Sequence, residues 1–245
     1  MRQIRIHVAA PLAEGAEVTL PEQAGEHVAR VLRLGVGDAV VLFDGGGHDY
    51  AATLISIARR AVTARVDARC DALPESPLRL TLVQGIARGE KMDLIVQKAT
   101  ELGAARIVPI VSERTEVRLD GERADKRLAH WRAVAVSACE QSGRARLPGI
   151  DAPLTLDAWL AALPDDGAAR LALLPQGETA PRALGALPHH ALLAVGPEGG
   201  FGERDVAALR AAGFAGLRLG PRVLRTETAG LAALAALQVL YGDLG

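Results

Sequence analysis

The sequence has few cysteines and few aromatic residues, and each scarcity excludes a class of protein. Its only cysteines, Cys70 and Cys139, lie far apart and have no second cysteine or histidine at metal-ligand spacing. This argues against a disulfide framework and against a zinc site, so we expect a cytoplasmic protein without a bound metal. Aromatic residues make up 3% of the chain, which argues against an RNA-binding sheet that stacks bases on exposed Phe and Tyr.

Lysine is scarce as well. Of 28 basic residues only Lys91, Lys98 and Lys126 are lysines, and the formal net charge is −1. The chain as a whole therefore carries no nucleic-acid signature. Arginine suits bidentate phosphate contacts and base stacking, but alanine is also abundant, so codon bias is an alternative source of the high ratio of arginine to lysine.

Long apolar runs are missing too. No run approaches the roughly 20 residues of a membrane span, and no charged segment followed by an apolar one is found near Met1. We therefore expect no membrane segment. The chain of 245 residues is 49% hydrophobic, which is enough core for one large domain or two ordinary ones.

The first part of the chain predicts a small antiparallel β-barrel with one helix. Short runs of alternating polarity, separated by glycine turns, indicate strands near residues 4–8, 40–43, 50–57 and 62–66. Residues 21–34 have helical periodicity, and Gly35 is expected to end the helix. The residues expected on its buried side are Ala24, Val28, Val31 and Leu32.

The opposite side of this predicted helix carries basic residues. His27 and Arg30 lie there, and Arg33 lies at its end. With Arg2 and Arg5 they predict a surface that contacts RNA phosphates, since arginines on a rigid face neutralise charge without reading sequence. The alternative is an ordinary solvated helix face.

A linker with two prolines at residues 72–77 predicts a domain boundary, giving domains over residues 1–72 and 73–245. After it, strands and helices alternate, which favours a mainly parallel α/β sheet covered by helices. The strands are expected near residues 78–86, 107–111, 171–174, 191–195 and 217–219. The helices are expected near residues 90–102, 122–141 and 203–212, around Trp159 and after Thr226.

Two glycine-bearing turns follow the last two predicted strands. The first is Gly196-Pro197-Glu198-Gly199-Gly200-Phe201, and the second covers residues 220–225. Glycines leave the main chain bare, so a flat ligand can approach it. Open α/β sheets bind ligands beyond the carboxyl ends of their strands. One such turn could be only a tight connection, whereas two at one sheet edge favour a ligand site.

Three side chains near these turns carry possible chemistry. Glu198 is either a hydrogen-bonding or proton-accepting group or a solvated loop carboxylate. Thr226 is expected to cap the last helix, and Glu227 suits the dipole of its first turn. Arg225 precedes the helix start, where the dipole does not favour a cation, so it predicts an anionic or ligand partner.

Several familiar motifs are absent: the dinucleotide fingerprint, the P-loop, His-Glu-x-x-His and the nucleophile elbow. Hydride transfer, NTP hydrolysis, zinc hydrolysis and serine acyl transfer therefore lose support.

The turn at 196–201 and the segment Leu-Gly-Pro-Arg-Val-Leu-Arg-Thr-Glu-Thr-Ala at 219–229 together resemble the paired signature of bacterial 16S ribosomal RNA uracil-N3 methyltransferases in the SPOUT superfamily. The resemblance covers nearly the whole chain and includes residues 27–33, 91–103 and 138–144. The sequence departs from the pattern at Gly202, where a serine cap is expected, and at Asp205, where glutamate is usual.

The resemblance implies a PUA-like β-barrel that docks RNA, followed by a SPOUT α/β domain tied in a trefoil knot, in a homodimer. It implies methylation of N3 of a uridine in the 16S rRNA of the small ribosomal subunit, with S-adenosylmethionine as cofactor. Leu219, Val223 and Leu224 would pack on the faces of the adenine. The implied cofactor-binding residues are Leu174, Pro175, Gly196, Pro197, Glu198, Gly199, Gly200, Leu219, Gly220, Val223, Leu224, Arg225 and Thr226.

The implied reaction requires uridine N3 to lose its proton before it attacks. We expect Arg225 to favour the uridine anion, because a nearby opposite charge favours an ionised group. Glu198 is the candidate proton acceptor or orienting group. Alternatives are ribose 2′-hydroxyl methylation on the same fold and an RNA-binding protein without catalysis. A dehydrogenase is a remote third, since the nicotinamide fingerprint is missing.

Overall fold

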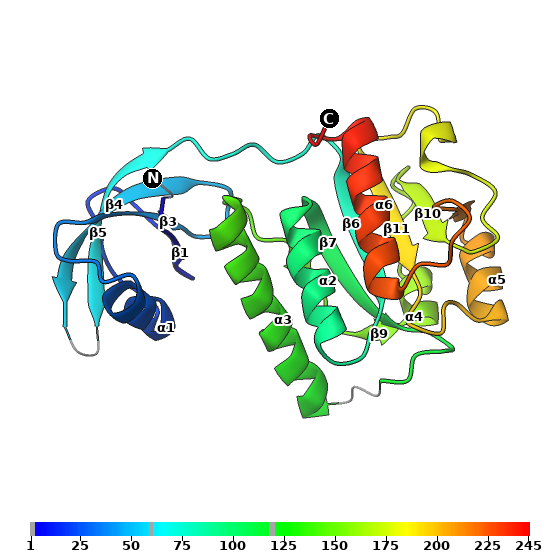
Figure 1. Ribbon diagram of the computed structural model, residues 1–245, viewed down its shortest axis with the longest axis horizontal. Coiled ribbons are helices and arrows are strands. Elements are labelled where there is room, and N and C mark those ends of the chain that lie inside the picture. Colours follow the sequence, from blue (N-terminus) through cyan, green and yellow to red (C-terminus); the bar gives the residue numbers. More distant parts are fainter. Residues whose placement is uncertain (1–2, 59–60, 118–120) are drawn as a thin grey trace. The chain divides into compact units, whose positions relative to one another are not determined.

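The computed structural model describes residues 3–58, 61–117 and 121–245, which form two compact units (Figure 1). Unit 1 consists of Met1–Glu75 and Val136–Leu147, and unit 2 consists of Ser76–Ala135 and Pro148–Gly245. The domain boundary after residue 72 stays a prediction. Among the described residues no helix is both long and apolar enough to cross a membrane.

Unit 1 is built on a five-stranded sheet in the order β1-β3-β4-β5-β2. Its strands are β1 (Arg5–His7), β2 (Glu17–Thr19), β3 (Ala39–Phe43), β4 (Asp49–Ile57) and β5 (Val62–Cys70). Strand β1 pairs with β3 in parallel and the other neighbours are antiparallel. The predicted antiparallel pairing is therefore confirmed for three of the four pairs, while β1 and β3 are parallel, and the sheet is a half-barrel.

The predicted helix over residues 21–34 is shorter and changes type. Helix α1 (Glu22–Glu26) continues into η1, a π-helical segment (His27–Val31). Val28 is buried, but Val31 is 65% exposed and Leu32 is 37% exposed, so the prediction that both are buried is wrong. A π-helix bonds residue i to i+5, and this change of period turns Val31 and Leu32 toward solvent, while Ala29 and Leu34 still pack against the core of the sheet. Arg33 follows with a φ of 54°.

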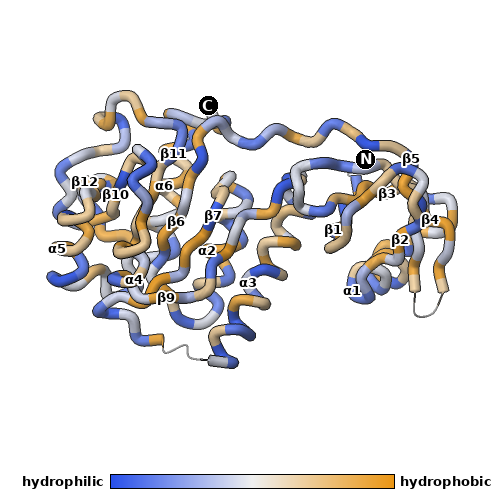
Figure 2. The backbone as a smooth tube through the Cα atoms, turned by 180° about the vertical axis from the view of Figure 1, so that it is seen from behind, coloured by the Kyte–Doolittle hydropathy of each residue, from blue (hydrophilic) through white to orange (hydrophobic). Residues whose placement is uncertain are grey.

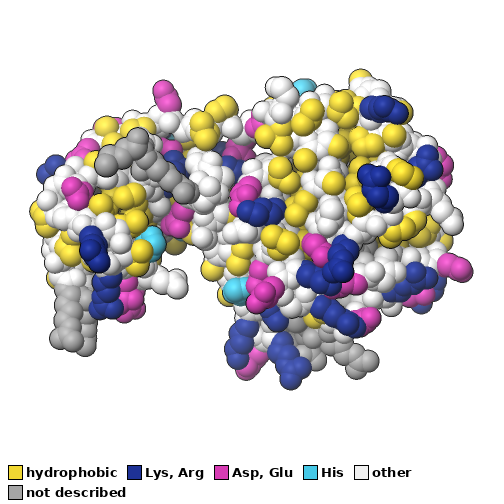
Figure 3. Space-filling view, in the orientation of Figure 1, with side chains coloured by type: hydrophobic (Ala, Val, Ile, Leu, Met, Phe, Trp, Pro, Cys, Tyr) yellow, Lys and Arg dark blue, Asp and Glu magenta, His cyan; other side chains and the backbone are white. Residues whose placement is uncertain are grey.

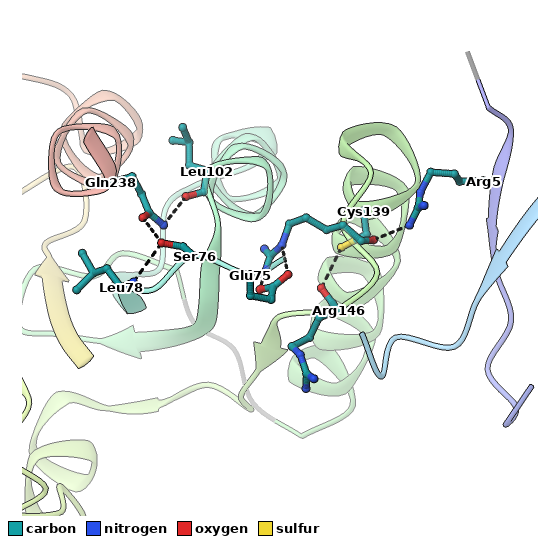
Figure 4. Close-up of polar contacts among 9 residues, drawn as sticks. Arg5, Glu75, Ser76, Leu78, Leu102, Cys139, Arg146 and Gln238 are labelled. Carbon is teal, nitrogen blue, oxygen red and sulfur yellow. Dashed lines mark hydrogen bonds and ion pairs between the residues drawn. The ribbon is translucent and has the colours of Figure 1, made fainter. Parts of the chain in front are cut away.

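The carboxyl end of helix α3 (Gly121–Ser142) belongs to unit 1. Its Cys139 packs with Phe43 and Ala145 in a buried cluster. The Cys139 Sγ donates a hydrogen bond to the Arg146 carbonyl at 3.6 Å, and Arg5 Nη2 donates to the carbonyl of Arg144 at 3.2 Å (Figure 4). A segment more than sixty residues from the sheet in sequence therefore completes its core.

Unit 2 contains a seven-stranded sheet in which every neighbouring pair is parallel, so the prediction of a mainly parallel sheet is confirmed. The order is β12-β10-β11-β6-β7-β8, and β9 also pairs with β7. The strands are β6 (Arg79–Gly85), β7 (Ala104–Val111), β8 (Gly149–Ile150), β9 (Leu154–Thr155), β10 (Ala169–Leu173), β11 (His190–Val195) and β12 (Ala215–Leu217).

Helices cover both faces of this sheet. They are α2 (Glu90–Glu101), most of α3, α4 (Leu156–Ala161), the 3₁₀ turn η2 (Pro181–Ala183), α5 (Glu203–Ala211) and α6 (Thr226–Tyr241). Helices α2 and α6 lie over one face (Figure 1). Leu82 and Leu193 pack in the core on that side, while their neighbours Val83 and Leu192 pack in a second core with Trp159 of α4. Strands buried on both faces read as continuous apolar runs, and β7 is largely orange in Figure 2.

Candidate functional site

A cavity of about 270 Å³ opens at the carboxyl ends of three adjacent strands of unit 2, β10, β11 and β12. Its lining comes from the loops that follow them, mainly residues 173–175, 195–200 and 217–224, together with Thr226 and Ala229 of α6. The carboxyl edge is where parallel sheets bind ligands. The cavity volume is near the lower end of the range for small-molecule sites.

The lining contains twelve of the thirteen residues that the sequence singled out for a cofactor. They are Leu174, Pro175, Gly196, Pro197, Glu198, Gly199, Gly200, Leu219, Gly220, Val223, Leu224 and Thr226. Arg225 is not among the lining residues. Pro221 and Arg222, inside the second predicted turn, also line it, whereas sequence reasoning missed Leu173, Val195, Leu217, Arg218 and Ala229. Most of these adjoin a predicted turn, so extending each turn by one or two residues into its strand would have found them.

Close backbone contacts shape the first turn. Gly200 donates its N–H to the Pro197 carbonyl at 2.8 Å, and its φ is 68°. A Cβ on Gly196 would lie 2.7 Å from the Gly200 carbonyl carbon, and one on Gly85 would lie 2.5 Å from the Pro197 ring. No side chain fits at either place, so the sequence requires glycine here.

Glu198 lies in this turn as a paired carboxylate. Its Oε1 accepts hydrogen bonds from Lys91 Nζ at 2.9 Å and from the Arg88 N–H at 3.0 Å. Partial burial raises the pKa of Glu198, but the bonds from Lys91 and Arg88 and the charge of Lys91 outweigh burial, so the pKa lies below its ordinary value. On the other side of the turn, Arg114 Nη1 donates to the Gly199 carbonyl at 3.0 Å. The turn is thus held by the loops that follow β6 and β7.

Thr226 does not cap α6, and that prediction is wrong. The N-cap residue is Arg225, whose side chain makes no capping bond. The Thr226 hydroxyl instead donates to the Gly196 carbonyl at 2.6 Å and accepts from Gln84 Nε2 at 2.9 Å. Sequence reasoning missed Gln84, and its only signal was one amide within the apolar run of β6.

Arginines surround the mouth of the cavity. Arg218 and Arg222 line it, and Arg225 is exposed directly before α6. Within the described residues none of these three arginines forms an ion pair, whereas Arg88 pairs with Glu116. Unpaired positive charge beside a cavity attracts anionic partners.

The two departures from the resemblance sit at the start of α5. Asp205 accepts hydrogen bonds from the Gly202 N–H at 2.8 Å and from the Glu113 N–H at 3.1 Å, so it caps the helix. A Cβ on Gly202 would lie 2.1 Å from the Glu113 carboxylate. Glu113 therefore occupies the space that a serine would need.

The basic residues predicted to contact RNA separate into two groups in unit 1. His27, Arg30 and Arg33 are exposed, and Arg30 pairs with Glu26 at 3.1 Å in a solvated i,i+4 pair. Arg5 is different: its side chain is 9% exposed, binds both oxygens of Asp49 and lies over the ring of Phe43. The prediction that Arg5 contributes to a phosphate-contacting surface is therefore corrected. Arg2 lies outside the described residues.

Comparisons with known proteins identify two domain families in this chain. Residues 74–238 match the family described as RNA methyltransferase domain, and residues 20–67 match the RNA methyltransferase PUA domain. The chain is 37% identical over 230 residues to ribosomal RNA small subunit methyltransferase E of Mycobacterium bovis, covering 92% of this chain and 87% of the relative. It is 30% identical to that of Bacillus subtilis, covering 95% of both.

Solved structures show the same similarity. The crystal structure of a ribosomal RNA small subunit methyltransferase E from Neisseria gonorrhoeae bound to S-adenosylmethionine has 36% sequence identity, covers 100% of both chains and gives a TM-score of 0.92. A Legionella pneumophila protein in complex with the same cofactor gives a TM-score of 0.94 at 36% identity, again over 100% of both chains.

Proposed function

The chain belongs to the ribosomal RNA small subunit methyltransferase E family, and on that premise we propose that it transfers a methyl group from S-adenosylmethionine to N3 of a uridine in 16S ribosomal RNA. The observation that carries the proposal is the cavity at the carboxyl ends of β10, β11 and β12. Both halves of the sequence signature that carries the resemblance contribute to its lining.

The residues that line the cavity suit S-adenosylmethionine in their chemistry. The glycine turn at 196–200 leaves main-chain groups bare for the polar edge of an adenine, and Leu174, Leu219 and Leu224 offer apolar contact for its faces. When bound, this cofactor supplies an electrophilic methyl group on a positively charged sulfur. We assign its binding to the twelve predicted residues that line the cavity, and place the side chain of Arg225 on the substrate side.

Arg225 and Glu198 have different roles in this mechanism. N3 of uridine carries a proton that must leave, and a guanidinium beside the base lowers the pKa of N3 by stabilising the anion. Glu198 is paired with Lys91 and has a lowered pKa, so we assign it to orienting the turn rather than to accepting the proton. Positioning the two reactants contributes roughly 7–11 kcal/mol in reactions of this kind.

Unit 1 supplies RNA docking in this proposal. His27, Arg30 and Arg33 are exposed along η1 and just after it. Contacts from such residues to phosphates hold an RNA in register without reading its sequence. The small ribosomal subunit is the partner, and the cytoplasm is the location that this substrate requires.

The proposal includes a homodimer and the trefoil knot that the resemblance implies. Exposed apolar residues support the dimer: Val239 and Leu240 of α6 are 53% and 45% exposed, and Leu94 of α2 is 42% exposed. Hydrophobic side chains gather over α6 in Figure 3. Sedimentation velocity tests the dimer directly, and a monomer at micromolar concentration contradicts it.

One experiment tests the function. Small-subunit rRNA from cells with and without the protein is digested to nucleosides and analysed by mass spectrometry, and purified protein with labelled S-adenosylmethionine is then added to the unmodified subunits. We expect 3-methyluridine to disappear without the protein and to return on addition. Gain of a 2′-O-methylnucleoside instead supports ribose methylation, and binding of RNA without methyl transfer supports an RNA-binding protein without catalysis.

A further inference from the structure

A buried hydrogen-bond chain joins the two walls of the cavity. One wall is the turn at 196–200, and the other is the loop at 218–225, which runs directly into α6. Gln84 Nε2 donates to Thr226 Oγ1 at 2.9 Å, and Thr226 Oγ1 donates to the Gly196 carbonyl at 2.6 Å. Gln84 is 0% exposed, and Thr226, which lines the cavity, is 6% exposed, so the chain is almost entirely shielded from solvent.

The direction of these hydrogen bonds is fixed by the groups at their ends. Gln84 Nε2 also donates to the carbonyl of Gly85 at 2.9 Å, and carbonyls can only accept. Turning the Gln84 amide around would place its oxygen against the Gly85 carbonyl and leave two acceptors facing each other. Only an N–H at this position and a hydroxyl at Thr226 satisfy both carbonyls.

The side chain of Gln84 is fully buried where three elements of unit 2 meet. Gln84 pairs in register with Val195, the residue before Gly196. Helix α6 also approaches Gln84, since a Cβ on Gly230 would lie 3.4 Å from Gln84 Oε1. The side-chain amide of Gln84 thus lies where β6, the end of β11 and the start of α6 meet.

We propose that Gln84 and Thr226 are positioning residues that fix the separation of the two walls of the cavity and thereby the affinity for the cofactor. The inference rests on the proposed function. Thr226 belongs to the lining of the cavity, and in this proposal its hydroxyl acts through the Gly196 carbonyl, because that hydroxyl already donates one hydrogen bond and accepts another. Without the bond, the first turn and the loop at 218–225 would separate, and the contacts that both make with an adenine would weaken together.

The test is isothermal titration calorimetry of the full chain with S-adenosylmethionine and with S-adenosylhomocysteine, which lacks the methyl group. Thr226→Val keeps the shape of the side chain and removes the hydroxyl. We expect the Kd of both ligands to rise about tenfold, which is about 1.4 kcal/mol. The two ligands share the adenine, so wider separation of the two walls should weaken the binding of both equally. Thr226→Ser restores the hydroxyl, and its Kd is expected within about twofold of the parent's.

Thr100→Val is the matched control. Thr100 is also fully buried in unit 2, and its hydroxyl also donates to a carbonyl, that of Val96 at 2.8 Å, but it lies within α2 and does not line the cavity. Both valine variants are expected to lower the Tm, whereas only Thr226→Val changes the Kd. A Kd for Thr226→Val equal to that of the Thr100→Val control overturns the proposal.

A second variant covers the case in which Thr226→Val does not fold. Gln84→Met leaves the hydrogen bond from Thr226 to Gly196 in place and removes the amide that donates to the Thr226 hydroxyl. We expect the Kd to rise about threefold. An unchanged Kd overturns the proposal. If the parent protein binds neither ligand, the proposed function fails instead, so the two failures are distinguishable.

Discussion

Lys91 and Glu198 form an ion pair at 2.9 Å that ties the glycine turn of the cavity to the first turn of α2. The side chains are 36% and 30% exposed, so solvent screens the pair and its contribution to stability is below about 1 kcal/mol. Its main effect is on the geometry of the turn, because the same carboxylate oxygen also accepts the N–H of Arg88.

Acid is expected to weaken this pair. The folded-state pKa of Glu198 lies below its ordinary value of 4.5, so the pair contributes its full stability above that value and loses it as the pH falls through the lower folded-state pKa. Lys91→Met should therefore be less stable than the parent near neutral pH, and the difference should shrink in acid. Denaturant unfolding on either side of pH 4.5 measures it.

Lys126→Met is the control for that prediction, because the side chains of Lys126 and its partner Glu122 are 80% and 89% exposed. It should match the parent at every pH. A stability difference for Lys91→Met that does not change with pH would contradict the assignment of the lowered pKa to this pair.

Arg225→Ala is expected to lower kcat by roughly a hundredfold, the size of effect seen when one charge-stabilising group is removed. The Kd for S-adenosylmethionine should stay within about twofold, since Arg225 does not line the cavity. Raising the pH should restore part of the rate, because a higher pH favours the N3 anion that the guanidinium no longer stabilises. Arg204→Ala, on the exposed face of α5, controls for loss of surface charge, and an unchanged kcat for Arg225→Ala rules out its assigned role.

Gly85→Ala is expected to destabilise the protein by about 1–3 kcal/mol and to weaken cofactor binding. The new methyl group would lie 2.5 Å from the backbone and ring of Pro197, so the first turn of the cavity must move. Gly149→Ala is the comparison, since its Cβ would meet only Arg106 at an ordinary 3.7 Å. Thermal unfolding and calorimetry distinguish the two variants, and equal behaviour would argue against a rigid turn.

Salt dependence tests RNA docking by unit 1. Replacing Arg30 or Arg33 with alanine should weaken binding to small-subunit RNA and lower the slope of log K against log salt by about 0.7–0.9 for each phosphate that the variant no longer neutralises. The measurement is filter binding at several salt concentrations. A slope identical to that of the parent would show that these arginines touch no phosphate.

Arg5→Met is expected to act on stability and not on RNA binding. The side chains of Arg5 and Asp49 are each 9% exposed, and Arg5 Nη2 donates to Asp49 Oδ1 at 2.9 Å. Removing one partner of a buried pair leaves an uncompensated charge and costs about 3–5 kcal/mol. Denaturant unfolding checks this, and Arg5→Met combined with Asp49→Leu should recover much of the loss because no buried charge remains.

The elements of unit 2 were predictable because their periodicity is strong and their strands are buried on both faces. The cavity followed from the same logic, since glycine turns after parallel strands must meet at one edge. The π-helical segment was not predictable, because Val31 and Leu32 fit a 3.6-residue period as well as any buried pair. Nothing in the local sequence marks the change of hydrogen-bond register.

Long-range pairing explains the remaining errors. Arg5 looks like any surface arginine until the fold brings Asp49 to it. Thr226 lies where a threonine commonly caps a helix, but its hydroxyl donates to the carbonyl of Gly196, thirty residues earlier. Local propensity reflects only the residue and its sequence neighbours. For both Arg5 and Thr226, a partner distant in sequence forms a buried hydrogen bond that local sequence does not predict.

Unit 1 is discontinuous in sequence, and this affects the order of folding during synthesis. Phe43 is 0% exposed because Cys139 and Ala145 pack against it. A nascent chain that has emerged only to residue 75 has made every strand of the five-stranded sheet, yet Phe43 lacks the contacts with Cys139 and Ala145 for another seventy residues. At ribosomal elongation rates of about 5–20 residues per second, chaperones can bind this incomplete core for several seconds before Cys139 and Ala145 are synthesised and pack against Phe43.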